Sequence, residues 1–482
     1  DLPFAVRSMT FYQQHFMLAW STEGMGEYDL HFKQDPIVSN TIPQLKNFRI
    51  NNLSTGADNT LWCGTDGSGI IKISLKNNFF RTIHQLSGRP LTHTPIRTFC
   101  QVDQKIWSGT KNNSIIEISN AGKPNASLAV ITLPGGMPEG RNNGISALAA
   151  DNNHHVYIAS ESTGLNIYNT RLKNFINWKD IAGTGAHPVT GTIRSLLCDK
   201  DSSLWMGLSN GSLVHLKLWC SPDGNYSLSY LQQYYPGENN PITALAADSR
   251  QRIWIACRFG GLRVLNRETG KYRAFRAGGY PGSLSNSDVL SLYADRQHRM
   301  WIGTSYGLNY INEDNIDDSQ PVFKSLNIDD GLPNSIIHGI QEDDNGYIWV
   351  STNKGLARID PAANGIIQFK VADGLLNDEF CDNAIWKSPE GYLFFGSVSG
   401  FNYCLPQSIH FSNLRFNLML SELQLGGRSV NENGIMVLNT RHPGPVPGYQ
   451  LSHRDNFFEL KIKAINFFNN KKCQYACFLE GN

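Results

Sequence analysis

The residues of this chain that could do chemistry are few and do not form a catalytic set. His154 and His155 are adjacent and lie close to Asp151, and these are residue types that bind metals. Neighbouring residues of a strand point to opposite faces, so the two imidazoles are poorly placed to hold one ion. The sequence contains neither a Gly-x-Ser-x-Gly motif nor a phosphate-binding loop. We therefore predict no catalytic residues, no metal site and no cofactor within this chain.

The cysteines do not indicate a disulfide framework or a zinc motif. The chain has nine of them, they are scattered, and no Cys-x-x-Cys pair occurs. A free cysteine usually behaves as a small buried hydrophobic residue. We predict this role for Cys63, Cys100, Cys198, Cys220, Cys257, Cys381, Cys404, Cys473 and Cys477.

Charge and hydropathy exclude two classes of partner for this region. The formal net charge is +1 over 482 residues and no basic block occurs, which argues against a nucleic-acid groove. The apolar runs are only as long as strands, so any membrane contact would come from segments outside this chain. The chain opens directly in a repeat and stops within a strand-like run, so we expect it to be a fragment.

The elements that must position any site recur with a regular period. A short apolar strand with a central aromatic residue is followed by a glycine turn, and the spacing between copies is 45 to 50 residues. A period of this size with strand-like content is typical of β-propeller blades. The nine copies centre on Met17, Trp62, Trp107, Tyr157, Trp205, Trp254, Trp301, Trp349 and Phe394.

Each copy reads as four antiparallel strands. In the sixth copy the strands are expected at 242–247, 253–257, 261–265 and 272–275. Asp248 opens the first turn, where its carboxylate can accept backbone N–H groups. We expect the central aromatic residue to pack between neighbouring sheets. An aspartate stands six residues before the aromatic in other copies too, at Asp151, Asp199, Asp295 and Asp343.

The repeats predict three parts. Residues 79–86 look like a lone outer strand, seven repeats follow it, and the last repeat has no clear fourth strand before the composition changes. Ring closure removes exposed sheet edges, so we expect 79–86 to pair beside Gly400–Tyr403. The prediction is a seven-bladed propeller over 79–408, preceded at 1–78 by the last two blades of another propeller.

From residue 412 the pattern changes to a different all-β module. Residues 418–425 and 435–438 are strand-like, with Gly426 and Gly427 between them. Residues 458–464 alternate between apolar and charged side chains, as a strand with one buried face does. We predict the start of an immunoglobulin-like β-sandwich over 412–482, which is shorter than the ~100 residues of that fold and therefore incomplete.

The clearest repeat resembles a known family. The phrase Asp-x-x-Gly-x-Ile-Trp-x-Ser/Gly-Thr-x-x-Gly-Leu, best seen from Asp343 to Leu356, is similar to the two-component-regulator propeller repeat. The linkers 330–334, 373–375 and 283–286 match that family as well. The tail, with Tyr475 and residues 478–481, resembles the triple-tyrosine module that follows such propellers, although Cys477 stands where a tyrosine is common.

The resemblance implies a role in signalling. In that family two propellers and the sandwich module form the periplasmic sensor of an inner-membrane hybrid histidine kinase, which often senses oligosaccharides and regulates transcription. It implies a homodimer through the C-terminal module, and no enzyme activity within this region. Two alternatives stay open, namely a secreted propeller enzyme such as a glycan lyase or hydrolase, and a protein-binding scaffold. A membrane helix and a kinase domain encoded after residue 482 would favour the sensor.

The alternation of strand direction predicts where a ligand binds. We expect the first-to-second and third-to-fourth turns to be short, and the other face of the disc to have nearly all the length variation, for example in the links 278–281 and 183–188. Variable loops on a rigid scaffold commonly have functional roles. Aromatic rings beside charged groups suit a sugar, which has apolar faces and hydroxyl edges. The candidates are Arg258, Phe259 and Tyr306 with Tyr280, and then Lys354, Glu161 and Lys111.

Overall fold

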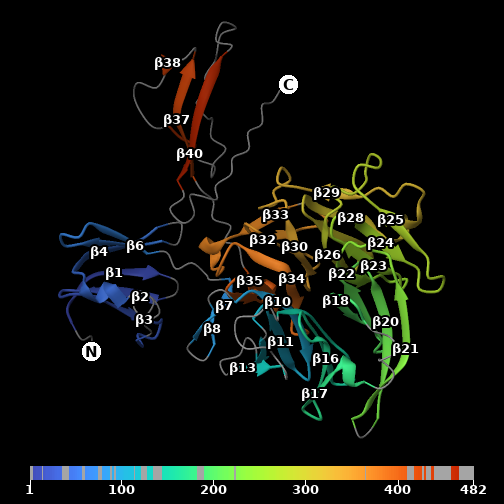
Figure 1. Cartoon of the computed structure of the whole chain (residues 1–482). Coiled ribbons are helices and arrows are strands. Elements are labelled where there is room, and N and C mark those ends of the chain that lie inside the picture. The colour runs from blue at the N-terminus through green and yellow to red at the C-terminus, as the bar shows by residue number, and fades with distance from the viewer. Residues whose placement is uncertain are drawn as a thin grey trace. The chain divides into compact units, whose positions relative to one another are not determined.

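The computed structural model of the chain describes residues 4–12, 15–34, 43–56, 60–73, 79–86, 89–91, 94–112, 114–120, 127–133, 144–181, 189–221, 224–363, 365–409, 417–425, 428–429, 436–438 and 457–465. The chain divides into two compact units. One is Asn78–His410, and the other comprises Asp1–Asn77 and Phe411–Asn482 (Figure 1). The described residues form antiparallel sheets and short 3-10 turns, so the all-β prediction is confirmed. No helix in these ranges combines the length and apolarity needed to cross a bilayer.

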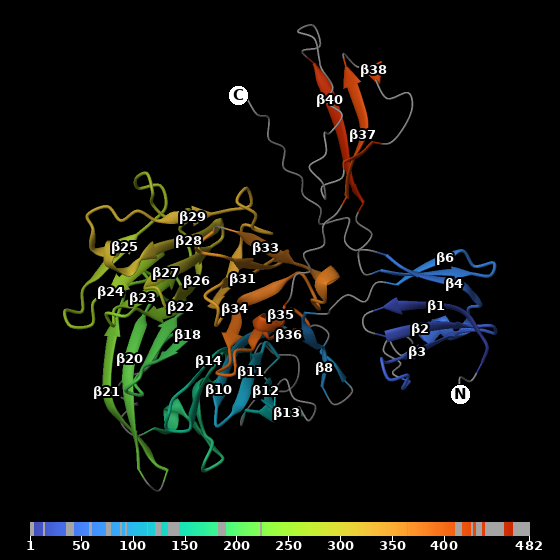
Figure 2. The ribbon, with the colours of Figure 1, turned by 180° about the vertical axis from the view of Figure 1, so that it is seen from behind.

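The first unit is a ring of four-stranded sheets (Figures 1 and 2). Its described residues form seven such sheets. The first three are β10 (Ile96–Val102), β11 (Lys105–Thr110), β12 (Ser114–Ser119) and β13 (Ser127–Thr132); β14 (Ile145–Ala150), β15 (His155–Ser160), β16 (Gly164–Asn169) and β17 (Asn174–Asn177); and β18 (Ile193–Cys198), β19 (Leu204–Leu208), β20 (Leu213–Cys220) and β21 (Tyr226–Tyr234).

The other four sheets follow the same order of strands. They are β22 (Ile242–Ala247), β23 (Ile253–Cys257), β24 (Gly261–Leu265) and β25 (Tyr272–Phe275); β26 (Val289–Ala294), β27 (Arg299–Thr304), β28 (Gly307–Asn312) and β29 (Lys324–Leu326); β30 (Ile337–Glu342), β31 (Ile348–Thr352), β32 (Gly355–Ile359) and β33 (Ile366–Phe369); and β34 (Phe380–Lys387), β35 (Leu393–Ser397), β36 (Gly400–Cys404) and β7 (Arg81–Ile83). The 3-10 turns of this unit are η2 (Trp178–Asp180), η3 (Glu313–Asp317), η4 (Val371–Asp373) and η5 (Pro406–Ser408).

The ring is closed by strands from both ends of the unit. The first strand of each sheet lies against the first strand of the next, and β34 lies against β10. In the last sheet β7 pairs with β36, with Ile83 opposite Phe401 and Arg81 opposite Tyr403. The predicted pairing of 79–86 beside 400–403 is therefore confirmed for Arg81–Ile83. The rest of that segment, β8 (Gln85–Leu86), instead pairs with β9 (Arg89–Pro90).

The repeat tryptophans form the contacts between sheets, as predicted. Trp254 is fully buried and packs in one cluster with Met300 and Ile302 of the next sheet. In most of the sheets the turn after this strand contains a glycine with positive φ, for example Gly261 at 83° and Gly355 at 109°. A Cβ on Gly261 would lie 2.2 Å from the Phe275 carbonyl oxygen, so the turn requires glycine there for space as well as for φ.

The second unit contains two small sheets near the N-terminus. They are β1 (Val6–Tyr12), β2 (His15–Trp20) and β3 (Met25–Tyr28), and β4 (Ile50–Thr55), β5 (Leu61–Thr65) and β6 (Ile70–Ile73), with η1 (Pro43–Asn47) between them. The two sheets pack together through Met17, Ile50 and Leu61. They match the first two repeats, and their assignment to a preceding propeller stays a prediction.

The C-terminal part of that unit contains one sheet among its described residues. In it β37 (Asn417–Leu425) pairs with β38 (Arg428–Ser429), β39 (Met436–Leu438) and β40 (Phe458–Ile465). The strands predicted at 418–425, 435–438 and 458–464 correspond to β37, β39 and β40. The immunoglobulin-like assignment stays a prediction, because Gly426, Gly427 and the tail with Cys473, Tyr475 and Cys477 lie outside the described residues.

Candidate functional site

The inner strand of every sheet in the ring has a β-bulge near its start. The register shifts after the first residue, for example between Ile96 and Thr98 and between Ile193 and Ser195. A bulge changes the direction of a side chain and often lies beside a site. The shifted positions are Arg97, Ser146, Arg194, Thr243, Leu290 and His338, and in β34 the longer stretch Cys381 to Ala384.

Two of these bulge residues hold neighbouring sheets together. Ser146 Oγ donates to the Ile193 carbonyl at 2.6 Å, and Thr243 Oγ1 donates to the Val289 carbonyl at 2.8 Å. Both acceptors belong to the first residue of the next inner strand. These hydroxyls are therefore structural, and they leave the charged bulge residues as candidates for ligand contact.

The first charged cluster surrounds Glu161, which follows β15. Arg97 Nη1 lies 2.7 Å from Glu161 Oε1, and Arg194 Nη1 lies 3.3 Å from the same oxygen. The Glu161 side chain is mostly buried, whereas Arg194 is 43% exposed. One carboxylate thus holds two guanidinium groups from two inner strands, and the cluster has a net positive charge.

The second charged cluster surrounds Asp382 in the β34 bulge. His338 Nδ1 lies 2.5 Å from Asp382 Oδ1, and Arg258 Nη1 lies 3.7 Å from Oδ2. Burial acts to raise the pKa of Asp382, but the hydrogen bond with His338 and the charges of Arg258 and Arg97 outweigh it and hold the pKa below its usual range. Arg258 also lies 3.3 Å from Asp288. The two clusters thus place cations and carboxylates at the same end of the inner strands.

His338 is held on both ring nitrogens. Its Nε2 lies 2.7 Å from Asn353 Oδ1, while Nδ1 contacts Asp382. Burial acts to lower the pKa of His338, and the Asp382 carboxylate and the Asn353 oxygen overcome this and raise it above its ordinary value. Two acceptors favour the imidazolium form, which donates from both nitrogens and cannot act as a base. The geometry therefore favours a charged donor over a general base.

Asn383 joins β34 to two other sheets of the ring. Its backbone φ is +56°, and its Nδ2 lies 3.0 Å from the Thr243 carbonyl oxygen and 3.2 Å from that of Leu290. These partners are 140 and 93 residues away in the sequence. Asn383 therefore holds the long bulge of β34 against other inner strands, at the end of the ring where the charged clusters lie.

The structure places the predicted site residues on turns of the same face, in different settings. Arg258 is 40% exposed, belongs to the Asp382 cluster and lies over the Phe259 ring at 5.6 Å. Glu161 belongs to the other cluster. Phe259 and Tyr306 are 70% and 62% exposed. Lys111 and Lys354 are exposed on their turns.

Tyr280 differs from the other candidates. Its hydroxyl donates to the Pro321 carbonyl at 2.7 Å, which ties it to the segment before β29, the outer strand of the next sheet. The link 183–188, also predicted to be on this face, lies outside the described residues. The structure thus gives Tyr280 a structural contact.

Sequence reasoning missed Arg97, Arg194, His338 and Asp382. Each stands directly after the buried apolar residue that begins an inner strand, or one residue later in β34. A charged residue at that point in an otherwise small and apolar strand was a visible signal. The bulge that turns these side chains outward has no comparable sequence signature, because it depends on pairing with the second strand.

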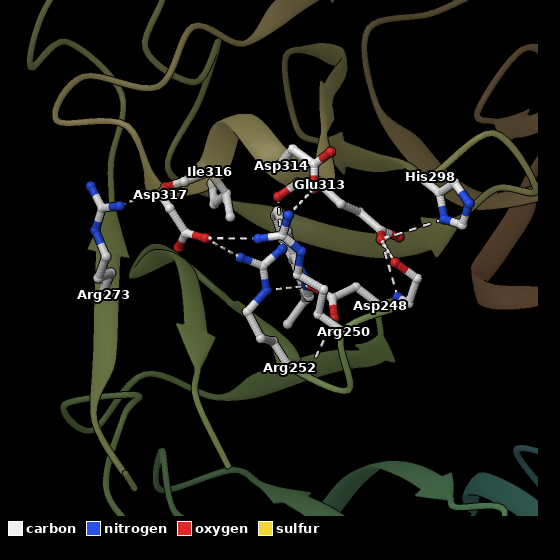
Figure 3. A network of polar contacts seen from close by, with 11 residues as sticks. Asp248, Arg250, Arg252, Arg273, His298, Glu313, Asp314, Ile316 and Asp317 are labelled. Atoms are coloured by element: carbon white, nitrogen blue, oxygen red, sulfur yellow. Dashed lines mark hydrogen bonds and ion pairs between the residues drawn. The ribbon is translucent and has the colours of Figure 1, made fainter. Parts of the chain in front are cut away.

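The opposite face has polar networks of a structural kind (Figure 3). Arg252 Nε lies 2.6 Å from Asp248 Oδ2, its Nη1 lies 2.8 Å from Asp317, and its Nη2 donates to the Glu313 carbonyl at 2.7 Å. Arg250 reaches the same 3-10 turn, η3. These charges join two neighbouring sheets and are already paired with one another.

The prediction that turns on this second face are short was wrong for the connection between β28 and β29, which contains η3. The turn between β20 and β21 is short, at 221–225, but these strands have 8 and 9 residues, so their hairpin is long. Figure 1 shows this hairpin extending past its neighbours. In both cases the extra chain lies at the outer part of the sheet, where added length does not disturb the packed inner strands.

The two adjacent histidines do not share a partner. His154 pairs with Asp103, while His155 Nδ1 lies 2.8 Å from Asp151 Oδ2. They contact different carboxylates, as expected for residues that point to opposite faces. Across the described ranges, no group of three or more His, Cys, Asp or Glu residues has the arrangement of a metal site. The cysteines of these ranges are free.

Comparison with known proteins gives one family and several related structures. Residues 283–306 and 331–354 match the two component regulator propeller model. A histidine kinase P4 of Formosa agariphila is 20% identical over 441 residues, which is 89% of this chain and 27% of that protein. The extracellular domain of BT3049 from B. thetaiotaomicron, described as a hybrid two component system, has a TM-score of 0.64 and 21% identity, and the match covers 95% of this chain and 59% of that chain.

The fold is also found in an enzyme. A catalytically inactive virginiamycin B lyase from Staphylococcus aureus has a TM-score of 0.50 and 11% identity, covering 67% of this chain and 98% of the lyase. Likeness at this level concerns the fold alone. The chain thus spans 27% of the length of the kinase and 59% of the extracellular domain. Two segments of the chain thus match two component regulator propeller repeats, and its ring of four-stranded sheets has the fold of a β-propeller.

Proposed function

We propose that this chain is the ligand-sensing region of a two-component signalling protein and that it lies outside the cytoplasm, in the periplasm. The matched repeats carry this proposal, together with the fold that the chain shares with an extracellular sensor domain. The charged clusters around Glu161 and Asp382 support a binding role rather than a catalytic one, because their groups are paired as donors and acceptors.

The ligand is proposed to be an oligosaccharide that binds where the charged clusters meet the exposed rings. Arg258 and Arg194 can donate to hydroxyl or carboxylate oxygens, and Asp382 and Glu161 can accept from hydroxyls. Phe259 and Tyr306 are exposed on neighbouring sheets and offer apolar surface for sugar faces. This assignment depends on one observation: charged groups of both signs at the strand bulges lie on the same face as exposed aromatic rings.

Calorimetric titration against a panel of oligosaccharides tests the site. Arg258→Ala and Tyr306→Ala are expected to weaken binding about tenfold each, as loss of a central contact commonly does. Neither change should lower the melting temperature, since both side chains are at least 40% exposed. Arg250→Ala, on the other face, and Tyr235→Ala, which is 65% exposed, are matched controls.

The outcomes separate the candidate functions. Binding that both site variants weaken and both controls retain supports the proposed site. Wild-type affinity in Arg258→Ala and Tyr306→Ala would place the ligand elsewhere. Release of shortened or unsaturated sugar products during the titration would favour the glycan-degrading enzyme, and binding of a protein with no sugar response would favour the scaffold.

A further inference from the structure

The carboxylate of each repeat turn is usually covered by the third-to-fourth turn of the next sheet. Arg267, from the β24–β25 turn, lies 2.8 Å from Asp199 of the preceding sheet and over the Trp205 ring at 5.4 Å. Thr170, after β16, donates to Asp103 of the preceding sheet. The groove between two sheets is filled with protein at these places.

The corresponding groove between the β22–β25 and β26–β29 sheets is filled more fully. There η3 supplies the Glu313 carbonyl and the Asp317 carboxylate to Arg252, which in turn pairs with Asp248 (Figure 3). The Arg252 side chain is 8% exposed. The 3-10 turn η3 and the buried Arg252–Asp248 ion pair together leave little room for a ligand between these sheets.

The groove beside Asp151 departs from this pattern. His155 stands where Arg252 stands in its own repeat, and Tyr157 replaces the tryptophan. Here the next sheet contributes the long β20–β21 hairpin, and a cavity of about 410 Å³ remains. That volume lies within the roughly 300–1,000 Å³ of small-molecule sites. Its lining includes His155, Asn169, Leu172, Leu218, Trp219 and Tyr226.

The carboxylate of Asp151 is fully used by its own sheet. It accepts from the backbone N–H groups of Asn153 and His155 at 2.8 and 3.0 Å, from His155 Nδ1 at 2.8 Å and from the Tyr157 hydroxyl at 3.2 Å. The side chain is 1% exposed. Its charge is therefore not offered to a cation, and the one cationic side chain of the lining, Arg171, is exposed.

Two neighbouring polar groups of the cavity can hydrogen-bond a ligand. His155 Nδ1 is held by Asp151, so Nε2 is the ring nitrogen left to contact a ligand. The Tyr226 hydroxyl accepts from Asn169 Nδ2 at 3.1 Å, and a hydroxyl can also donate one hydrogen bond. The His155 and Tyr226 rings lie 5.4 Å apart. A ligand hydroxyl, which both donates and accepts, satisfies this pair.

Part of the lining offers apolar surface. The Trp219 ring is 56% exposed and Leu172 is 48% exposed, so both can contact a ligand. An indole beside hydroxyl-binding groups matches a ring whose faces are apolar and whose edges carry hydroxyls. We propose that the cavity between the β14–β17 and β18–β21 sheets is a second binding site, which takes one neutral pyranose-sized sugar unit against Trp219, His155 and Tyr226.

Saturation-transfer NMR with glucose, galactose, mannose and xylose tests this proposal. At least one of these probes is expected to bind the whole chain, and Trp219→Ala should weaken that binding about tenfold through loss of the stacked ring. Tyr226→Phe should weaken it while keeping the aromatic surface. Tyr235→Ala removes a similarly exposed ring of the same sheet, outside the cavity, and should leave binding unchanged.

This site is independent of the charged clusters, so Arg258→Ala should retain the signal. Loss of the signal in Arg258→Ala with retention in Trp219→Ala would assign the sugar to the other face and overturn the proposal. Absence of binding by all four probes would overturn it as well. Melting curves of each variant show whether the fold is kept, and since Trp219 is exposed its truncation is not expected to unfold the chain.

Discussion

At the scale of single residues, the aspartate six positions before the repeat aromatic has a role beyond its turn. One of its oxygens accepts turn N–H groups, as Asp295 does from Gln297 and Arg299 at 2.9 Å. The other accepts the indole N–H at 2.8 Å in four repeats, in the pairs Asp199–Trp205, Asp248–Trp254, Asp295–Trp301 and Asp343–Trp349. A buried indole needs such an acceptor, so the six-residue spacing reflects a hydrogen bond.

Removing one of these carboxylates should therefore destabilise the fold strongly. Asp248→Ala removes the acceptor of Trp254 Nε1 and, from the buried Arg252 guanidinium, the carboxylate that its Nε contacts. Loss of one partner of a buried ion pair costs about 3–5 kcal/mol. We expect urea unfolding to begin at clearly lower concentration than in the wild type.

Asp314→Ala is the matched control for that prediction. Asp314 is 69% exposed and pairs with Arg250, itself 52% exposed, on the surface. Exposed pairs contribute roughly 0–1 kcal/mol, so the unfolding curve should hardly change. Equal shifts for the two variants would show that the buried carboxylate is no more important than a surface one.

The His338–Asp382 pair predicts a pH dependence of stability. The folded pKa of His338 is raised above its ordinary 6.5, so its contribution is complete below about pH 6.5 and is lost as the pH rises through the folded pKa. The pKa of Asp382 is lowered from 3.8, so its contribution is lost only as the pH falls through that lower value. The pair should stabilise the folded state most at pH values between the folded pKa of Asp382 and that of His338.

Melting temperatures of the wild type and of His338→Gln, measured across pH, check this. The wild type should melt higher at pH 6, and the difference should shrink as the pH rises. His298→Gln is a suitable control, because that histidine is 67% exposed and lies 3.8 Å from its carboxylate. A difference between wild type and His338→Gln that stays constant with pH would contradict a charged His338.

At the scale of elements, the bulge of the inner strand is the feature that separates binding groups from packing groups. It recurs in the N-terminal sheets, where Arg7 and Asn51 stand at the shifted positions and Arg7 Nη1 donates to Asn51 Oδ1 at 2.5 Å. The same local geometry thus presents polar residues wherever the repeat occurs. The identity of the residue at the bulge decides whether it joins sheets, like Thr243, or stays available, like Arg194.

The stability of β7, the strand that closes the ring, should depend on strands from the far end of the unit. Phe80 precedes β7, is 3% exposed, and its ring lies 5.4 Å from Phe369 and 6.3 Å from Phe395. Phe80→Ala should cost about 3–5 kcal/mol and release β7 from β36. Hydrogen exchange should then rise in 81–83 and in 400–404, although these lie at opposite ends of the unit.

Phe275→Ala is the comparison for the closing strand. Phe275 ends β25, is 6% exposed and contacts Phe323 at 5.9 Å. Its truncation should raise exchange around β25 and leave 81–83 and 400–404 protected. If Phe80→Ala leaves β36 protected, the ring does not depend on β7 for closure.

At the scale of the whole molecule, we expect dimerisation through the C-terminal module. The apolar residues Phe458, Leu460 and Ile462 of β40 are 39–48% exposed in this structure. Light scattering of a longer protein that continues past residue 482 should give twice the monomer mass, and Leu460→Ser should reduce the dimer fraction if β40 takes part. A strict monomer with and without ligand would contradict the expectation.

The sequence by itself determined the repeat, its strands and the positions of its aromatic residues. These features arise from local chemistry, because a buried strand needs a run of apolar residues and a tight turn needs glycine or aspartate at a set position. The closure of the ring by Arg81–Ile83 was also predictable. An unpaired strand precedes the seven repeats, and the last repeat lacks its fourth strand.

Only the tertiary structure decided which polar residues meet. Asp382 lies beside His338 and Arg258 because three separate inner strands and turns converge at one end of the ring. The cavity at Asp151 exists because the β20–β21 hairpin leaves a groove that Arg267 and η3 fill elsewhere. Neither arrangement has a period or a motif, since each depends on side chains that are far apart in the chain and are brought together only when the sheets pack.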